Sequence, residues 1–366
     1  MRILQLSSAS SFGGGERYLV DLSNALNNRD HDVYVVLRPR SPIADQLRVL
    51  ASRIRTLPLR NALDAPSARA LARIVKEERI DVIHAHMARD YSLAAYAARS
   101  SKHAKLIVTR HVLFPLNALH RRTLGRASRI IAVSGAVARQ LRGQRLVADN
   151  KIALVHNGID VDRYAKACEN FDRKEFLRNK ELPVDCLLVS SIGELRKLKR
   201  HEDFIHAAAI TAREVSNAHF VIAGVDTSSN EENRRELIAL VEKLKLKDRF
   251  HFLGWLNDAE KLLCATDVFV SASASESFGL SIVEAMAAGT AVVATRTEGA
   301  QEVVEDQVNG MLVGIENVGE LAESIVKLLK DEPLRRTLGT HARSAACERF
   351  SLNRMVDEIE KIYWVG

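Results

Sequence analysis

Aromatic residues are scarce in this chain of 366 residues, where Phe, Trp and Tyr together make up 5%. A surface that stacks nucleic-acid bases or carbohydrate rings relies on aromatic side chains, so the composition argues against such a surface. Hydrophobic residues (47%) and charged residues (27%) are ordinary for a soluble globular protein. The chain is longer than one hydrophobic core usually supports, which predicts two domains.

Cysteine is also rare, and no two cysteines form a CxxC pair. This scatter predicts neither a zinc site nor a disulfide framework, and it suits a reducing cytoplasmic compartment. No uncharged run approaches the roughly 20 apolar residues that cross a bilayer. The first residues, Met1–Ser7, are typical of a short strand and not of a signal peptide. We therefore expect a cytoplasmic protein, soluble or peripheral on the inner face of the cytoplasmic membrane. The four cysteines are Cys168, Cys186, Cys264 and Cys347.

Charge is unevenly divided along the chain. Residues 1–165 hold 27 Lys and Arg against 13 Asp and Glu, a net charge of +14, whereas residues 166–366 hold 26 against 33. The excess indicates an anionic partner, and a basic residue close to an anionic membrane contributes about 1 kcal/mol of attraction. An ordinary solvated arginine-rich surface is the alternative. Nucleic acid is not expected, because few aromatics interleave with the arginines and no nucleic-acid motif is present. The arginines that gather are Arg121, Arg122, Arg126, Arg129, Arg139, Arg142 and Arg145.

Short apolar runs alternate with helical patterns in both halves of the chain. In Glu16–Asn27, for example, Leu19, Leu22 and Leu26 recur at helical spacing. Such βαβ alternation predicts an α/β protein with parallel, doubly wound sheets. Strands are expected at Arg2–Ser7, Asp32–Leu37, Asp81–His84, Lys105–Thr109, Arg129–Val133 and Lys151–Val155, and again at Cys186–Ile192, His219–Ala223, Arg249–Leu253, Asp267–Ser271, Ala291–Thr295 and Met311–Val313.

This pattern predicts two Rossmann-like domains, over residues 1–165 and 166–348. The polar segment Asp160–Leu182 lacks a clear strand and is expected to connect them. Residues 349–366 are expected to form a last helix that crosses back to the first domain. Ligands of open α/β sheets bind beyond the carboxyl ends of the strands, so we expect an enzyme with its active site in the cleft between the domains. The apolar stripe of the last helix is Leu352, Val356, Ile359 and Tyr363.

The most informative segment is Asp267–Thr295, with the sequence DVFVSASASESFGLSIVEAMAAGTAVVAT. Glu276 lies in a loop after a strand, and Glu284 follows after seven residues, inside a helix. The amides of Phe278–Leu280 open that helix, so they lack partners within it and suit hydroxyls or phosphate oxygens. The two carboxylates can accept hydrogen bonds from sugar or ribose hydroxyls. The alternative is that Glu276 caps the helix and Glu284 faces solvent.

This segment resembles the signature of the retaining GT-B glycosyltransferases of family 4 (glycosyl transferases group 1), in which two glutamates flank seven residues. The later run GAQEVVEDQVNGMLV is also similar to the family. The resemblance implies that the first domain binds the acceptor and the second binds the donor across an interdomain cleft. It further implies that Glu276 and the amides of Phe278, Gly279 and Leu280 hold the donor sugar, and that Glu284 holds the ribose.

The glycine run before Glu16 is similar to the GGxE loop of the family. It follows the first strand and opens a helix, so its amides can face a pyrophosphate or the acceptor. It lacks the GxGxxG spacing of a dinucleotide-binding fold. The resemblance assigns Gly14 and Gly15 to the donor and Gly13 to the acceptor.

Two histidine-containing runs, DVIHAH ending at His86 and TRH ending at His111, also resemble family landmarks. His111 follows a strand, so it should face the cleft, and in the family this position contacts the donor sugar near the reacting centre. His84 and His86 lie on a strand and at its end, and we expect one to point into the core and the other toward the acceptor. His86 and Arg110 are the candidate acceptor contacts.

The segment Gly193–Lys199, GELRKLK, departs from the family pattern. Relatives have Gly-Arg-Leu, three residues and then Lys, and this Arg and Lys neutralise the pyrophosphate. Lys199 matches the lysine, but Glu194 stands where arginine is expected. We expect Arg196 to turn toward the diphosphate instead, with Glu194 rotated away; an ordinary basic turn is the alternative. Charged contacts here would stabilise the departing diphosphate, so no metal is expected, and no DxD-like site is evident.

By resemblance, the backbone around Trp255 and Leu256 should contact the nucleotide base, and packing is the alternative role for Trp255. Together with the resemblance, these features predict transfer of a hexosyl unit from a UDP- or GDP-sugar to a hydroxyl, and the resemblance alone implies that the transfer retains the anomeric configuration. The expected acceptor is a cell-envelope glycan or a lipid-linked acceptor, as in lipopolysaccharide or exopolysaccharide synthesis. No cofactor is expected. The candidate catalytic residues are His111, Glu276, Lys199 and Arg196.

Two other functions remain open. A nucleotide-sugar 2-epimerase would use a similar fold but should lack the paired glutamates. A non-catalytic paralogue that only binds nucleotide sugar is favoured by Glu194 alone.

Overall fold

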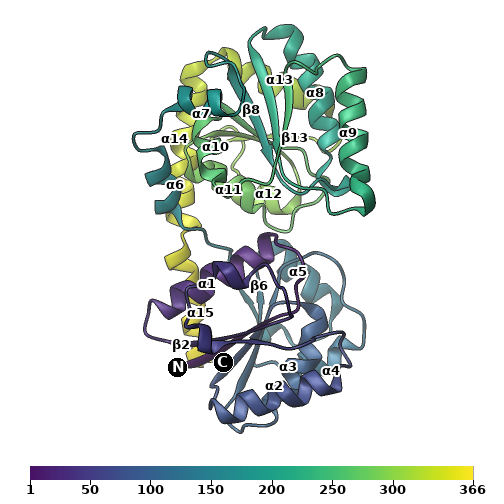
Figure 1. Ribbon diagram of the computed structural model, residues 1–366, viewed down its shortest axis with the longest axis vertical. Coiled ribbons are helices and arrows are strands. Elements are labelled where there is room, and N and C mark those ends of the chain that lie inside the picture. Colours follow the sequence, from purple (N-terminus) through teal and green to yellow (C-terminus); the bar gives the residue numbers. More distant parts are fainter. Residues whose placement is uncertain (366) are drawn as a thin grey trace. The chain divides into compact units, whose positions relative to one another are not determined.

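The computed structural model describes residues 1–365, and these form two compact units. One unit consists of Met1–Gly158 together with the segment from Leu352 onward, and the other is Ile159–Ser351. Each unit contains one parallel sheet with helices on both faces (Figure 1). The expectation of two Rossmann-like domains is confirmed. Along the chain the units meet at residues 158 and 351, compared with the expected 165 and 348.

The sheet of the first unit has seven parallel strands in the order β3-β2-β1-β4-β5-β6-β7. Because β1 pairs with both β2 and β4, the strand order reverses at β1. Six of these strands were expected within one or two residues of their bounds. The seventh, β3, is a short edge strand whose residues are partly exposed, so it carries no apolar run to signal it. The strands are β1 (Arg2–Ser7), β2 (Asp32–Leu37), β3 (Ile54–Thr56), β4 (Val82–Ala85), β5 (Lys105–Arg110), β6 (Arg129–Ala132) and β7 (Ile152–Leu154).

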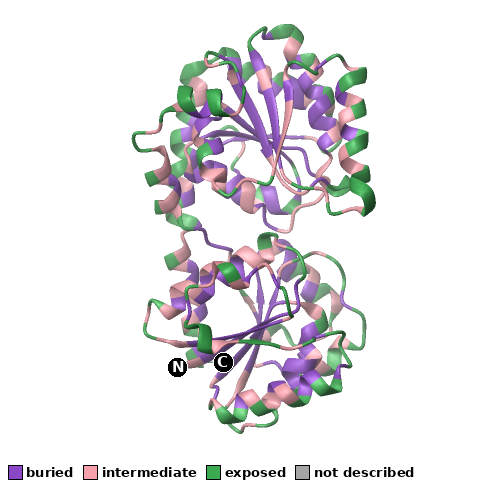
Figure 2. Cartoon of the chain, in the orientation of Figure 1, coloured by how far each residue is buried: buried purple, intermediate pink, exposed green. Residues whose placement is uncertain are grey.

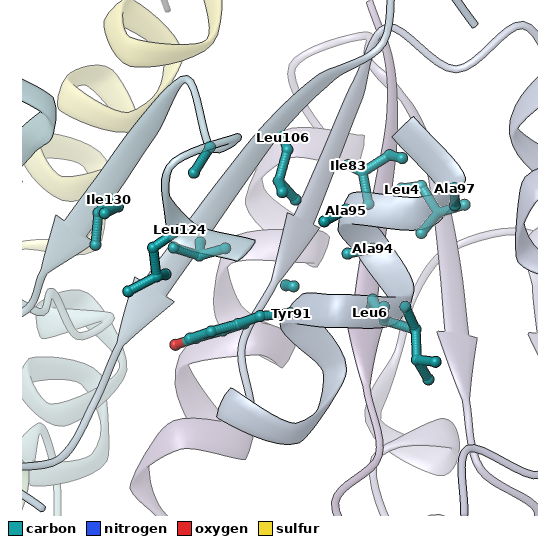
Figure 3. Close-up of a cluster of buried hydrophobic side chains, with 14 of the residues drawn as sticks. Leu4, Leu6, Ile83, Tyr91, Ala94, Ala95, Ala97, Leu106, Leu124 and Ile130 are labelled. Carbon is teal, nitrogen blue, oxygen red and sulfur yellow. The ribbon is translucent and has the colours of Figure 1, made fainter. Parts of the chain in front are cut away.

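Two hydrophobic clusters cover the two faces of this sheet. On one face, Met355, Val356, Ile359 and Tyr363 of the last helix pack beside the first helix. On the other face, helices such as the one that carries Tyr91 pack against strand leucines and isoleucines (Figure 3). The first face carries α1 (Gly14–Asn27) and α15 (Leu352–Val365), and the second carries α2 (Ala65–Glu77), α3 (Tyr91–Ala98), α4 (His120–Leu124) and α5 (Gly135–Gln144).

The sheet of the second unit has six parallel strands in the order β10-β9-β8-β11-β12-β13. Here the order reverses at β8, which pairs with both β9 and β11. All six strands were expected from the sequence. They are β8 (Leu187–Ile192), β9 (Ala218–Ala223), β10 (Phe250–Gly254), β11 (Val268–Ser271), β12 (Ala291–Thr295) and β13 (Met311–Val313).

Helices cover both faces of the second sheet as well, so its strands are buried while the outer helix faces are exposed (Figure 2). The segment Asp160–Leu182, expected only as a connection, contains two helices that pack within this unit. One face carries α8 (His201–Glu214), α9 (Glu232–Lys243) and α13 (Val318–Lys330). The other carries α6 (Val161–Cys168), α7 (Arg173–Asn179), α10 (Ala259–Ala265), α11 (Leu280–Ala287), α12 (Glu298–Val303) and α14 (Glu332–Arg349).

Two of the four cysteines form a disulfide, although their scatter in the sequence predicted no disulfide framework. Cys168 at the end of α6 bonds to Cys264 in α10. The two residues are 96 positions apart in the sequence, and only the packing of α6 against α10 brings them together. Cys186 is free and buried, and Cys347 is free and exposed.

Among residues 1–365, none of the helices has both the length and the apolar character that crossing a bilayer requires.

Candidate functional site

The position where strand order reverses marks a candidate site in each unit, because ligands of doubly wound sheets bind beyond the strand ends at that point. In the second unit, the loop Gly193–Lys199 follows β8 and the loop Ala272–Gly279 follows β11. The amide of Ala274 donates a hydrogen bond to the carbonyl of Leu198 at 2.9 Å. The two loops are therefore joined to each other directly at the reversal.

Lys199 and Glu276 meet across this reversal. The ammonium nitrogen of Lys199 lies 2.6 Å from Oε1 of Glu276, and the hydroxyl of Ser273 donates to the same oxygen at 2.7 Å. The side chains of Lys199 and Glu276 are 27% and 11% exposed. The aliphatic part of Lys199 lies along Gly193, where an added Cβ would be 3.5 Å from its Cε. A partly buried cation and anion thus stand side by side where a ligand is expected.

The amino end of α11 lies beside this pair. Gly279 precedes the helix with a φ of +97°, a left-handed conformation that favours glycine. Its carbonyl accepts the amides of Ile282 and Val283, which leaves the amides of Leu280 and Ser281 outside the helical pattern. The Phe278 ring is buried and meets Phe350 edge-on at 5.5 Å between ring centroids. The aromatic contact anchors the loop, so its amides are fixed in place.

Gly299 in α12 supports the same loop, a role that the sequence reasoning missed. Its amide donates to the carbonyl of Glu276 at 3.1 Å. An added Cβ at Gly299 would lie 2.6 Å from the Glu276 carbonyl oxygen and from the Phe278 nitrogen. Only glycine permits this close approach. Glu284, further along α11, is half-buried.

The structure pairs Arg196 with Glu194 instead of separating them. Nη1 of Arg196 lies 3.3 Å from Oε2 of Glu194, and the other carboxylate oxygen accepts the hydroxyl of Thr227. The Arg196 side chain is 55% exposed. It also lines a cavity of about 210 Å³ with residues of α9 such as Asn233 and Leu237. We expected Glu194 to rotate away and Arg196 to turn toward the diphosphate. In this arrangement the two side chains bind each other instead.

Backbone contacts hold the ends of β8, β9 and β10 closely together. The amide of Gly193 donates to Ala223, and that of Gly224 donates to Gly254 at 2.8 Å. A Cβ at Gly224 would lie 1.9 Å from the carbonyl oxygen of Gly193, so no other residue fits there. Just beyond β10, Trp255 is 49% exposed and its indole donates to Asn257 at 2.9 Å. Trp255 is therefore not a core residue, whereas the adjacent Leu256 packs on a hydrophobic cluster.

In the first unit, the reversal lies between β1 and β4, and the glycine loop follows β1. Gly13 precedes α1, and its amide donates to Oε2 of Glu16 at 3.0 Å. Gly14 is exposed and begins α1. Gly15 lies against the ring of His111, where an added Cβ would be 3.6 Å from Cγ. The start of α1 and the end of β5 are thus in contact.

His84 and His86 are both buried, with ring centroids 4.3 Å apart. The two rings lie on one face, because residues two positions apart on a strand share a face. His84 bonds within the core, whereas Nδ1 of His86 lies 3.4 Å from Nε2 of His111. Burial, together with the charge of the neighbouring Arg110, lowers the pKa of His111 to about 3, so the ring is neutral.

Arg110 is 6% exposed and donates to the carbonyl of Phe114. Burial lowers its pKa. In the part of the chain that the structure describes, Arg110 has no carboxylate partner. Within the same residues, no group of three or more His, Cys, Asp or Glu side chains is placed to hold a metal ion.

The sequence of this chain is similar to known protein families and to individual proteins. Residues 172–345 match the family model of the glycosyl transferases of group 1, and residues 12–163 match that of glycosyltransferase family 4. The chain is 30% identical over 312 residues to the N-acetyl-alpha-D-glucosaminyl L-malate synthase of Bacillus anthracis, covering 82% of this chain and 79% of that protein. It is 24% identical over 381 residues to the UDP-Gal:alpha-D-GlcNAc-diphosphoundecaprenol alpha-1,3-galactosyltransferase of Escherichia coli, covering 99% and 96%.

Solved structures share the fold. A glycosyltransferase from Rickettsia africae superimposes with a TM-score of 0.88 at 21% identity, over 99% of this chain and 97% of that one. The Anabaena HepE protein in complex with UDP-glucose superimposes with a TM-score of 0.85 at 24% identity, over 99% and 98% of the two chains.

Proposed function

The chain belongs to the glycosyl transferases of group 1 and is a glycosyltransferase, and from this premise we propose that it transfers a hexosyl unit from a nucleoside-diphosphate sugar to a hydroxyl group, with retention of the anomeric configuration. The contact of Lys199 with Glu276 carries this proposal. A cation such as Lys199 can bind the diphosphate, and a carboxylate such as Glu276 can accept hydrogen bonds from the sugar hydroxyls. The two side chains lie 2.6 Å apart. They lie where a doubly wound sheet binds its ligand.

Each group of the donor has a partner in this proposal. Lys199 and the free amides at the start of α11 bind the diphosphate oxygens, since both are positive. Glu276 accepts hydrogen bonds from the sugar hydroxyls, and Glu284 accepts them from the ribose. Trp255 and Leu256 line the base, and the Trp255 side chain is half-exposed just beyond β10.

During the reaction, negative charge develops on the departing diphosphate and has to be stabilised. The bond between the anomeric carbon and the diphosphate oxygen breaks, and the acceptor oxygen bonds to the same face of that carbon. The departing phosphate oxygen takes the acceptor's proton. Lys199 stabilises the growing negative charge on the diphosphate, which preorganised cations do effectively in a partly dry site. His111 is neutral, so it positions a hydroxyl by hydrogen bonding and adds no charge. Because lysine and helix amides supply the positive charge, we propose a metal-independent reaction.

We propose UDP as the first nucleotide to test. One relative is named for UDP-galactose, and one similar structure holds UDP-glucose. GDP-sugars come second.

The proposed acceptor is anionic or lies at an anionic surface, because the first unit carries the positive charge of the chain. Relatives are named for acceptors as different as malate and a diphosphoundecaprenol-linked sugar, and both carry negative charge. Phe114 and Leu119 are 60% and 83% exposed, and the arginines that follow them in the sequence, Arg121, Arg122 and Arg126, are exposed as well. This combination suits peripheral contact with an anionic leaflet, where a lipid-linked glycan acceptor resides.

Thermal stability in the presence of UDP, GDP and ADP tests the donor assignment. A nucleotide at 100 times its Kd stabilises the native protein by about 2.7 kcal/mol. Slow hydrolysis of the matching nucleotide sugar then tests for catalysis without knowledge of the acceptor. If no nucleoside diphosphate stabilises the protein and no nucleotide sugar is hydrolysed, the proposed function is rejected. Binding without hydrolysis or transfer would instead indicate a non-catalytic binding protein.

A further inference from the structure

A buried chain of hydrogen bonds links the last helix of the first unit to His111. It begins at Tyr363 of α15, which is 1% exposed. The Tyr363 hydroxyl lies 2.6 Å from Nδ1 of His84, and Nε2 of His84 lies 2.6 Å from the hydroxyl of Thr109. Gln5 of β1 donates from Nε2 to the same tyrosine oxygen at 3.4 Å.

The chain continues from Gln5 to the candidate site. Nε2 of His86 lies 2.7 Å from Oε1 of Gln5, and Nδ1 of His86 lies 3.4 Å from Nε2 of His111. Gln5, His84 and His86 are all buried. Tyr18 packs edge-on against the His111 ring at 4.8 Å between centroids, which restricts its rotation. The sequence brings these groups from β1, β4, β5, α1 and α15 to one place.

Along this series of hydrogen bonds, the protonation of one group determines whether the next group donates or accepts. The amide oxygen of Gln5 can only accept, so Nε2 of His86 carries a proton and donates to it. Burial lowers the pKa of His86 well below its ordinary value, so its ring is neutral and its Nδ1 is a bare acceptor. Nε2 of His111 must then carry the proton that points to it. Nδ1 of His111 is left as a lone pair, and no residue among 1–365 bonds to it.

We propose that Gln5 and Tyr363 are positioning residues that hold His111 in one neutral tautomer, with its proton on Nε2 and its Nδ1 lone pair presented to a hydroxyl of the substrate. Tyr363 fixes the orientation of the Gln5 amide by accepting a hydrogen bond from its N–H. If that amide were rotated by 180°, donor and acceptor would be exchanged in the bond from Gln5 to His86 and in the bond from His86 to His111. The role of Nδ1 toward substrate rests on the proposed function, whereas the tautomer does not.

Nitrogen NMR of the full-length protein tests this inference. Long-range proton–nitrogen correlations, with histidine labelled by ¹⁵N and His111 assigned through His111→Asn, show which ring nitrogen is protonated. In the wild type we expect a protonated Nε2 and an unprotonated Nδ1. Tyr363→Phe, which removes only a hydroxyl, should shift His111 toward a mixture of both tautomers. It should lower kcat by about five- to tenfold, the effect of one neutral hydrogen bond, with the donor KM unchanged.

Tyr91→Phe is the matched control. Tyr91 is also 1% exposed in the first unit, and its hydroxyl donates to the carbonyl of Thr109 outside the chain of side-chain bonds. It should leave the His111 tautomer unchanged. If Tyr363→Phe does not fold, Gln5→Met tests the same link with the same readouts. A proton on Nδ1 in the wild type, or a tautomer unaffected by both variants, overturns the inference. Absence of turnover in the wild type rejects the proposed function and leaves the tautomer result standing.

Discussion

The ammonium of Lys199 and the carboxylate of Glu276 lie 2.6 Å apart. Each neutralises the other, so neither partly buried charge is left unpaired. A bound diphosphate would offer Lys199 a second anion, and sugar hydroxyls would offer Glu276 new donors. Because the two residues would bind different groups of the donor, removal of either partner should have a distinct effect.

Lys199→Met should weaken the binding of UDP and slow transfer. A hydrogen bond to a charged group contributes about 1.5–3 kcal/mol, so affinity should fall roughly tenfold to a hundredfold. Calorimetric titration with UDP measures the change. Lys197→Met is the control, since Lys197 lies in the same turn but pairs with Glu236 at the surface. Equal affinities of Lys199→Met and the wild type would remove Lys199 from the diphosphate site.

Glu276→Gln should separate binding from turnover. If Glu276 holds the sugar, affinity for free UDP should stay nearly unchanged while turnover of the intact donor collapses. Initial rates and UDP titration on the same preparation decide the point. Wild-type turnover in this variant would exclude Glu276 from the reaction.

Glu284→Ala should show the reverse of this pattern. If Glu284 bonds to the ribose, as proposed, the loss of this half-buried carboxylate should lower affinity for UDP by roughly tenfold to a hundredfold. The matched control is Glu323→Ala, on the exposed side of α13. A folded Glu284→Ala protein with unchanged UDP affinity would contradict the ribose assignment.

Much of the fold was predictable because each βα unit leaves its own apolar pattern in the sequence. Twelve strands were recognised in this way, whereas β3 was missed because its three residues are mostly exposed at the sheet edge. The resemblance to the family pointed to Lys199 and Glu276, and both lie in loops that follow buried strands. Their contact at 2.6 Å depends on the strand order, which local patterns do not reveal.

Contacts between distant residues account for what the sequence did not show. His84 and Tyr363 are 279 positions apart, and Cys168 and Cys264 are 96 apart. Neither pair has a local signal. Gly299 begins the run GAQEVVEDQVNGMLV, but only the backbone of Glu276 passing beside it shows why glycine is required there.

Arg196 and Glu194 provide an opposed pair of tests. If Arg196 leaves Glu194 for the diphosphate when the donor binds, Arg196→Ala should slow transfer by about 2–4 kcal/mol of barrier. Glu194→Arg should then be tolerated or improve UDP binding, since it adds a cation and removes the competing carboxylate. Turnover and UDP affinity of both variants are the measurements. A silent Arg196→Ala together with a damaging Glu194→Arg would show that the ion pair is structural.

The buried histidines of the first unit should make stability depend on pH. Burial lowers the pKa of His84 to about 3. An unfolded histidine takes up a proton below its ordinary pKa of about 6.5, so the free energy of unfolding falls as the pH drops below that value. At pH 5 the loss from His84 alone is about 2 kcal/mol. Asp90 acts in the opposite direction, because burial raises its pKa to about 6, and it offsets part of this loss.

His84→Gln should therefore reduce the difference in unfolding free energy between pH 7 and pH 5 by about 2 kcal/mol, whatever its effect on absolute stability. Urea unfolding in a Trp255→Phe background measures this difference, because Trp364 of α15 is then the only tryptophan left to report on the first unit. His103→Gln, at an exposed histidine, should leave the difference as in the wild type. An identical pH difference in His84→Gln and His103→Gln would show that His84 is not held neutral in the folded protein, and the hydrogen-bonded chain from Tyr363 to His111 would lose its first link.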